Sequence, residues 1–365
     1  MRRNLELMRF PLALLVLIGA ASPSRAQQGC CGQSYPGAEL QIGNAETSVA
    51  FYHDALGMDY SPAWTGKPNP FSSVQGKLTG MSGQLRTATM VIPGADFHIQ
   101  LVESTGIDRK PVMARRQDIG ATGFILYVRN LDAGIAALKK ANAPIVSAGG
   151  KPVNIADKNG KGRAILAQDP DGYFVELRQI DPLPATTAPA SSNVIGARMS
   201  LSVADTGKST RYWSDLLNFD VTSEPFGKNP AALALNGTPH AQIRKSIAKI
   251  RPGGRFAHPG PNVVFELQEF KGIDRKALNP RYQDPGAGGF VLRFKTFDPS
   301  VRGKEIEEYA KLLRDAGMPK ILTAGNGPED QMFRFAMFTQ DLNGFIMEVT
   351  QSIGVPRDQP GGRGE

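Results

Sequence analysis

The sequence predicts an α+β fold in which a strand, a helix and several further strands recur four times, grouped as two modules. Three observations carry this prediction. The chain has 365 residues, enough for roughly two domains. With 41% hydrophobic residues, it can form a packed core. Finally, Gly106–Lys110 (GIDRK) recurs as Gly272–Lys276, and Gln117-Asp118 recurs as Gln283-Asp284 at the same offset of 166 residues, which indicates a tandem duplication.

The elements follow one order in every unit. Apolar and polar residues alternate over Ala38–Gly43, the period of a half-buried strand. Asn44 then caps a helix, and strand-like segments continue to Val102. The second unit repeats this order with a strand over 124–128, a helix over 131–143 and strands over 164–167 and 173–177. Units three and four have predicted strands over 199–203 and 289–294 and predicted helices over 206–217 and 304–316.

A leader precedes the first module. Arg2 and Arg3, the apolar stretch Pro11–Ala21 and the small-x-small site Ser24–Ala26 are typical of a signal peptide over residues 1–26. We therefore expect a periplasmic or secreted protein with no stable membrane insertion after cleavage. The leader holds four Arg and one Glu of the formal +8, so the mature chain carries +5, too little to indicate a nucleic-acid partner.

The remaining chain divides at changes in composition. We expect a first module over 36–180, a Pro/Ala/Ser linker over 181–194, a second module over 195–352 and a disordered tail over 353–365. Cys30 and Cys31 lie before the first module; because they are adjacent, they cannot form a CxxC motif, and we assign them no catalytic role.

Four segments carry a family resemblance. Ser48–Met58 (SVAFYHDALGM) and Ser209–Phe219 (STRYWSDLLNF) resemble the first helix of the vicinal oxygen chelate superfamily, which includes glyoxalase I, bleomycin-resistance proteins and extradiol dioxygenases. Gln168–Leu177 (QDPDGYFVEL) resembles the closing turn and strand of its second unit, and Gln340–Val349 is a weaker copy. The resemblance implies four βαβββ units forming two glyoxalase-type modules around clefts. It does not fix an activity, because this superfamily hosts lyases, epimerases, dioxygenases and binding proteins.

The resemblance also implies where metal ligands would lie. The family takes one ligand from the first strand of each unit and one from the last strand. The first-strand positions fall on Gly37, Gly123, Arg198 and Gly289, none of which supplies a useful ligand. The last-strand positions, our candidate metal ligands, are Gln100, Glu176, Glu266 and Glu348. Without imidazole, Ni, Zn and Fe are disfavoured, which leaves no cofactor or a weakly held Mg²⁺ or Mn²⁺.

The pairing of the units decides which candidates meet. If the units of one copy face each other, Gln100 meets Glu176 and Glu266 meets Glu348. If the copies exchange partners, Gln100 meets Glu348 and Glu176 meets Glu266. Residues two apart on a strand share a face, which adds a set of candidate substrate-binding residues to the same faces. These are Arg198, Arg293, His98 and Tyr127.

Two function classes remain open. The first is an exported protein with a degenerate metal site that binds a small, anionic molecule in a sheet-lined cleft, with Arg198 replacing the charge of the metal. The second is a divalent-metal-dependent lyase, isomerase or dioxygenase in which Glu176, Glu266 and Glu348 are the catalytic residues. In either case we expect a small-molecule ligand and a monomer or homodimer. The repeated Asp/Arg pair of GIDRK is expected to fix a loop rather than bind substrate.

Overall fold

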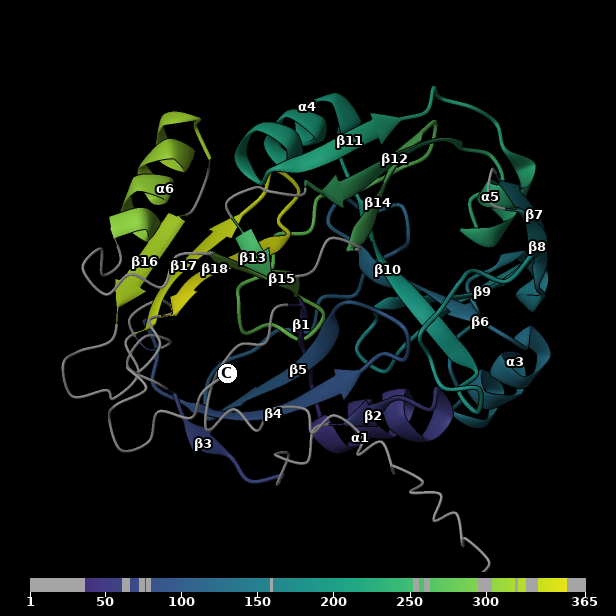
Figure 1. Cartoon of the computed structure of the whole chain (residues 1–365), viewed down its shortest axis with the longest axis horizontal. Coiled ribbons are helices and arrows are strands. Elements are labelled where there is room, and N and C mark those ends of the chain that lie inside the picture. The colour runs from purple at the N-terminus through teal and green to yellow at the C-terminus, as the bar shows by residue number, and fades with distance from the viewer. Residues whose placement is uncertain are drawn as a thin grey trace, which may run out of the picture.

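The computed structural model describes residues 37–60, 66–71, 76, 80–157, 160–251, 256–258, 263–294, 304–318, 321–325 and 334–352. The predicted signal peptide (1–26), Cys30, Cys31 and the predicted tail (353–365) lie outside these residues. The fold is α+β, as predicted, with two curled β-sheets and few helices (Figure 1).

Four units follow one another along the chain. Unit one contains β1 (Gly37–Gln41), α1 (Ala45–Ala50), η1 (Phe51–Ala55), β2 (Asp59–Tyr60), β3 (Asn69–Pro70), β4 (Gln84–Val91) and β5 (His98–Thr105). Unit two contains β6 (Thr122–Val128), α3 (Leu131–Lys140), η2 (Ala148–Gly150), β7 (Val153–Asp157), β8 (Gly160–Gln168) and β9 (Phe174–Asp181). Unit three contains β10 (Val194–Ser202), α4 (Thr206–Arg211), η3 (Tyr212–Leu216), β11 (Phe219–Ser223), α5 (Pro230–Leu235), β12 (Gln242–Ile250), β13 (Phe256–His258) and β14 (Val264–Lys271). Unit four contains β15 (Gly288–Phe294), α6 (Lys304–Asp315), β16 (Ile321–Gly325), β17 (Arg334–Gln340) and β18 (Ile346–Ser352).

The helix starts are set by side-chain caps. Asn44, as predicted, accepts a hydrogen bond from the backbone N–H of Thr47, and Asn130 and Asp205 cap α3 and α4 in the same way. Each cap satisfies a backbone donor that the first turn leaves unpaired, so the helix begins directly after the first strand. Strand β9 ends at Asp181 and strand β10 begins at Val194. Each strand therefore includes one residue of the predicted linker.

The strand order settles how the units pair. One sheet has ten strands, in which β1 of unit one runs antiparallel to β15 of unit four. The other has eight strands, in which β6 of unit two runs antiparallel to β10 of unit three. Of the two pairings left open by the sequence, the structure therefore has the one in which the copies exchange partners.

The hydrophobic core lies on one face of each sheet and joins the two sheets together. The rings of Phe265, on β14, and Phe290, on β15, have centroids 4.9 Å apart, and Tyr52 meets Phe124 at 6.5 Å. Because side chains alternate along a strand, the opposite face of each sheet is left to the intervening residues, many of them polar. That second face, here called the polar face, carries the candidate sites.

The duplicated GIDRK loops form a reciprocal clasp at the junction of the modules. The Asp284 carboxylate accepts the backbone N–H of Lys110 at 2.8 Å, and Asp118 accepts that of Lys276 at 3.0 Å. Each aspartate also binds the arginine three residues before it, Arg281 or Arg115, at 2.7 Å. The motif therefore holds one copy of the loop against the other, consistent with the expected structural role.

We predict that Asp284→Ala lowers the free energy of unfolding by about 1–3 kcal/mol, because it leaves the backbone N–H groups of Lys110 and Arg281, whose hydrogen bonds are part-buried, without their acceptor. Asp118→Ala should have a similar effect, since its contacts are the same by the repeat. Chemical denaturation of both variants checks this. Exposed Asp132, which pairs with the exposed Arg163, provides the control, and an equal effect of Asp132→Ala would contradict the clasp.

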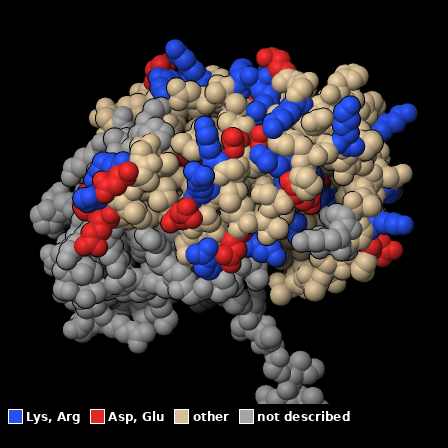
Figure 2. All heavy atoms as spheres, turned by 90° about the horizontal axis from the view of Figure 1, so that it is seen from above, with Lys and Arg blue, Asp and Glu red and all other residues tan. Residues whose placement is uncertain are grey.

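One face of the molecule shows no large patch of charges of a single sign among its described residues (Figure 2). On the face shown in Figure 2, Lys and Arg side chains are interspersed with Asp and Glu. Within the described part of the chain, no helix has the length and apolar composition needed to cross a bilayer.

Candidate functional site

The eight-stranded sheet brings four predicted residues to one polar face. Arg198 on β10 is opposite Ile125 on β6, which in turn pairs with Glu176 on β9. Tyr127 is two residues further along β6, and Glu266 on β14 pairs with Ser200 two residues along β10. Residues paired across neighbouring strands, or two apart on one strand, share a face. Arg198, Tyr127, Glu176 and Glu266 therefore form one cluster, here called the charged cluster.

Glu266 is buried between donors. Its carboxylate lies 2.9 Å from the Lys245 ammonium and accepts the Nε2–H of Gln268 at 2.7 Å. Burial alone would raise the pKa of Glu266, but the positive charges of Lys245 and Arg178 outweigh it and hold that pKa well below its usual range. Glu266 is therefore a carboxylate at neutral pH and not a proton-accepting base of ordinary strength.

Glu176 is also buried and paired with a cation. The Nε–H of Arg178 donates to its carboxylate at 2.6 Å, and both side chains are 5% exposed. Burial disfavours the charged form of Arg178, yet Glu176 and Glu266 together raise its pKa above the usual value. Each of the two glutamates thus already has a cation beside it.

Arg116 adds a further cation that the sequence analysis did not single out. It follows the first GIDRK loop, is 3% exposed, and lies with its guanidinium carbon 5.3 Å from the ring centroid of Phe174. Its Nε–H donates to Asn236 Oδ1 at 3.0 Å, while Nη1 makes no hydrogen bond within the described residues. Burial lowers the pKa of Arg116 to about 10, against the opposing charges of Glu266 and Glu176, so it remains protonated at neutral pH.

Arg198 and Tyr127 occupy the other side of the cluster. The Arg198 guanidinium carbon lies 5.4 Å from the Tyr127 ring centroid, a cation–π geometry. The Tyr127 hydroxyl is buried without a hydrogen-bond partner among the described residues, and burial raises its pKa. We include in the charged cluster the cations that lie around its two glutamates, so that it has four cationic side chains and two glutamates. The cations are Arg116, Arg178, Arg198 and Lys245.

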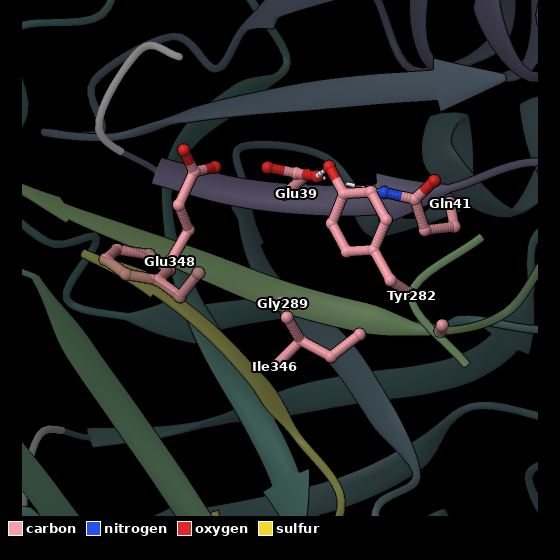
Figure 3. A pocket seen from close by; sticks show the side chains of 8 residues that line it. Glu39, Gln41, Tyr282, Gly289, Ile346 and Glu348 are labelled. Carbon is pink, nitrogen blue, oxygen red and sulfur yellow. Dashed lines mark hydrogen bonds between the residues drawn. The ribbon is translucent and has the colours of Figure 1, made fainter. Parts of the chain in front are cut away.

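The ten-stranded sheet carries the other predicted residues. Gln100 on β5 pairs with Glu39 on β1, and His98 pairs with Gly37, so both lie on the polar face. Burial lowers the pKa of His98. Glu348 on β18 lines a small pocket with Glu39, Gln41 and Tyr282 (Figure 3). Arg293 lies further along β15, opposite Thr350, and its side chain is outside the described part of the structure.

The first-strand residues do not fit the metal-ligand set that the resemblance implies. A Cβ atom at Gly123 would lie 2.2 Å from the Phe174 carbonyl oxygen, at Gly37 2.4 Å from that of His98, and at Gly289 2.8 Å from that of Ile346. Real side chains do not tolerate such distances, and Arg198 at the fourth position is a cation. Within the described ranges, no three His, Cys, Asp or Glu side chains are grouped to hold a metal ion.

The charge environment of Glu266 predicts a pH dependence. Its pKa is depressed in the folded protein and returns to about 4.3 on unfolding, so its contribution to stability is present above that pH and lost as the pH falls toward the folded value. Between about pH 6 and pH 3, the free energy of unfolding of the wild type should therefore fall more steeply than that of Glu266→Gln. Urea denaturation across this range checks the prediction, and equal slopes would contradict it.

A sequence model of the Glyoxalase/Bleomycin resistance protein/Dioxygenase superfamily matches residues 36–177. Solved structures with a similar fold include two single-residue mutants of glyoxalase I from Zea mays. The first mutant has a TM-score of 0.51 at 17% identity, covering 87% of this chain and 92% of that one. The second has a TM-score of 0.50 at 16% identity, covering 87% and 93%. No curated protein matches the chain.

A putative dioxygenase from Bacillus subtilis aligns with a TM-score of 0.47 at 12% identity, covering 90% of this chain and 87% of that one. The family model places residues 36–177 in the glyoxalase/bleomycin-resistance/dioxygenase superfamily, that is, the vicinal oxygen chelate superfamily. The whole chain has a fold similar to that of glyoxalase I from Zea mays. The identities are low, so the likeness to the solved structures establishes the fold alone.

Proposed function

We propose that this chain binds a small anionic molecule at the charged cluster, and that the metal site of its superfamily has degenerated here. One observation carries the proposal: Arg116 is a buried cation whose Nη1 has no partner among the described residues. A buried charged donor left unpaired is unfavourable by several kcal/mol, on the order of 2–5, unless something accepts from it. A carboxylate or phosphate oxygen is the acceptor that suits a guanidinium best.

The net charge of the cluster supports an anionic ligand. Glu176 and Glu266 are each engaged by a cation, Arg178 and Lys245 respectively. Arg116 and Arg198 have no carboxylate partner within the described residues, so the cluster has an excess of about two positive charges. The Tyr127 hydroxyl, also unpartnered there, supplies a further donor. A dianion of small size therefore matches the unpaired donors in both charge and hydrogen bonding.

Metal-free calorimetric titration tests this function. In EDTA, acetate, malonate and inorganic phosphate are the probes, and we expect saturable binding with the dianions preferred. Arg116→Met and Arg198→Ala should each weaken binding by about tenfold or more, because each removes a charge-assisted hydrogen-bond donor. Arg163→Met, at an exposed arginine paired with Asp132, is the matched control. Elemental analysis of the protein as purified, before any EDTA is added, tests the metalloenzyme alternative, which a stoichiometric metal would support.

We also propose that the protein is exported, since residues 1–26 have the charged start, apolar stretch and cleavage site of a signal peptide. N-terminal sequencing of the protein recovered after cell fractionation tests this. A start near Gln27 in the exported fraction supports the proposal, and a full-length chain retained in the cytoplasm overturns it.

A further inference from the structure

The ten-stranded sheet has a pocket whose polar groups are nearly all hydrogen-bond acceptors. Its polar lining consists of Glu39, Gln41, Tyr282 and Glu348. Both glutamates are buried, at 5% and 4% exposure respectively. Figure 3 shows the Tyr282 hydroxyl turned toward the Glu39 carboxylate, to which it donates at 2.6 Å. The proton of that hydroxyl is therefore used within the pocket and is not offered to a ligand.

The orientation of Gln41 identifies an acceptor without a donor. Its Nε2–H donates to Glu39 Oε1 at 2.9 Å, and since a carboxylate can only accept, the amide cannot be turned around. Oε1 of Gln41 must then face elsewhere. Gln41 is 2% exposed, and this oxygen makes no hydrogen bond within the described residues. A buried amide oxygen in this state requires a donor from a ligand or water.

The size of the pocket restricts that donor. The cavity measures about 10 Å³, the space of roughly one water molecule. Ala287, Gly289, Phe290 and Ile346 complete the lining, so the carbon chain that carries the donor would contact apolar carbon. An ammonium group has the size of water, donates up to three hydrogen bonds and carries the charge that two carboxylates favour. We propose that this pocket is a second ligand site, which accepts the primary ammonium group of a small alkylamine.

The duplication explains how one chain has two sites of opposite polarity. Tyr282 and Arg116 occupy the same position of the repeat, 166 residues apart, directly after the arginine that each clasp holds in place. Arg116 reaches the polar face of the eight-stranded sheet, whereas Tyr282 reaches that of the ten-stranded sheet and stacks on Phe338 at 4.6 Å. The cationic residue of one site is thus replaced in the other by an aromatic hydroxyl.

Calorimetric titration with ethylammonium chloride tests this second site. Potassium chloride, tetramethylammonium chloride and magnesium chloride are the comparison probes. We expect saturable binding of ethylammonium and much weaker binding of the other three, because none of them offers N–H donors in a water-sized group. Gln41→Met and Glu348→Gln should each weaken ethylammonium binding about tenfold, as expected for the loss of a hydrogen bond to a charged group. Gln84→Met, at an exposed position on β4, is the matched control.

Three outcomes would overturn the proposal: no binding of ethylammonium, equal binding of potassium or tetramethylammonium, or magnesium binding that is stronger and lost in Glu348→Gln. A Gln41→Met variant that binds as the wild type would also overturn it, and its thermal unfolding midpoint confirms that the variant is folded. Tyr282→Phe should keep or strengthen ethylammonium binding, because it removes one of the donors to Glu39 Oε1 and leaves the Gln41 donor in place. Arg116→Met should leave ethylammonium binding unchanged, so failure of the anion site and failure of this site are distinguishable.

Discussion

Replacing Glu266 by alanine is expected to lower the free energy of unfolding by about 3–5 kcal/mol, the largest effect at any predicted site residue. The Glu266 side chain is 4% exposed and lies 2.9 Å from the Lys245 ammonium. Its removal leaves Lys245 and Arg178 near Arg116 with one carboxylate, Glu176, among them. Uncompensated charge in a buried cluster is far more unfavourable than the same charge in water. Urea denaturation at pH 7 measures the loss.

A second substitution shows how much of the lost stability comes from the unpaired charge and how much from the lost packing of the side chain. Lys245→Met in the Glu266→Ala background removes the stranded ammonium and should recover part of the lost stability, which a double-mutant cycle reports. Glu224→Ala, at an exposed position, is the matched control and should change stability by less than about 0.5 kcal/mol. A loss below about 1 kcal/mol in Glu266→Ala would show that the cluster is solvated and not the buried charge network described above.

Placing histidine at Gly123 is the second large prediction. This is the first-strand ligand position of unit two, so Gly123→His restores the residue type that the superfamily resemblance implies. Because a Cβ there would lie 2.2 Å from the Phe174 carbonyl oxygen, we expect a destabilisation of about 3 kcal/mol or more and no zinc site. Chemical denaturation and elemental analysis after zinc loading measure the two effects.

The control for this variant is another glycine. A Cβ atom added at Gly227 would have no other atom within 4 Å, and the backbone there is not left-handed, so Gly227→His should be tolerated. A folded Gly123→His protein that binds stoichiometric zinc would show that the first-strand position has room for a ligand and that only the residue type is missing.

The repeat and the caps made much of the fold predictable. The in-register return of Gly106–Lys110 implied the duplication, and Asn44 has the short polar side chain that caps a helix. The pairing of the units was not predictable, because the first strands of both candidate partners of unit one, Gly123–Val128 (GFILYV) and Gly289–Phe294 (GFVLRF), are similarly apolar. That choice depends on contacts between residues far apart in the chain, such as the pairing of Ala38 on β1 with Phe290 on β15.

Part of the candidate site was predictable and part was not. Strand periodicity correctly placed Glu176, Glu266, Arg198 and Tyr127 on one face, given the pairing. Arg116 was missed because it lies in a loop, where no periodicity reports the direction of a side chain. The repeat itself held the available signal: the position that is Arg116 in the first copy is Tyr282 in the second, although the residues on both sides of it match.

We propose that the charged cluster binds a small anion without a metal. Calorimetric titration of malonate into the protein in EDTA, compared between the wild type and Arg116→Met, tests it most directly. We expect saturable binding by the wild type and an affinity about tenfold or more lower in the variant. Binding that occurs only after a divalent metal is added, or that is unchanged in Arg116→Met, would contradict it.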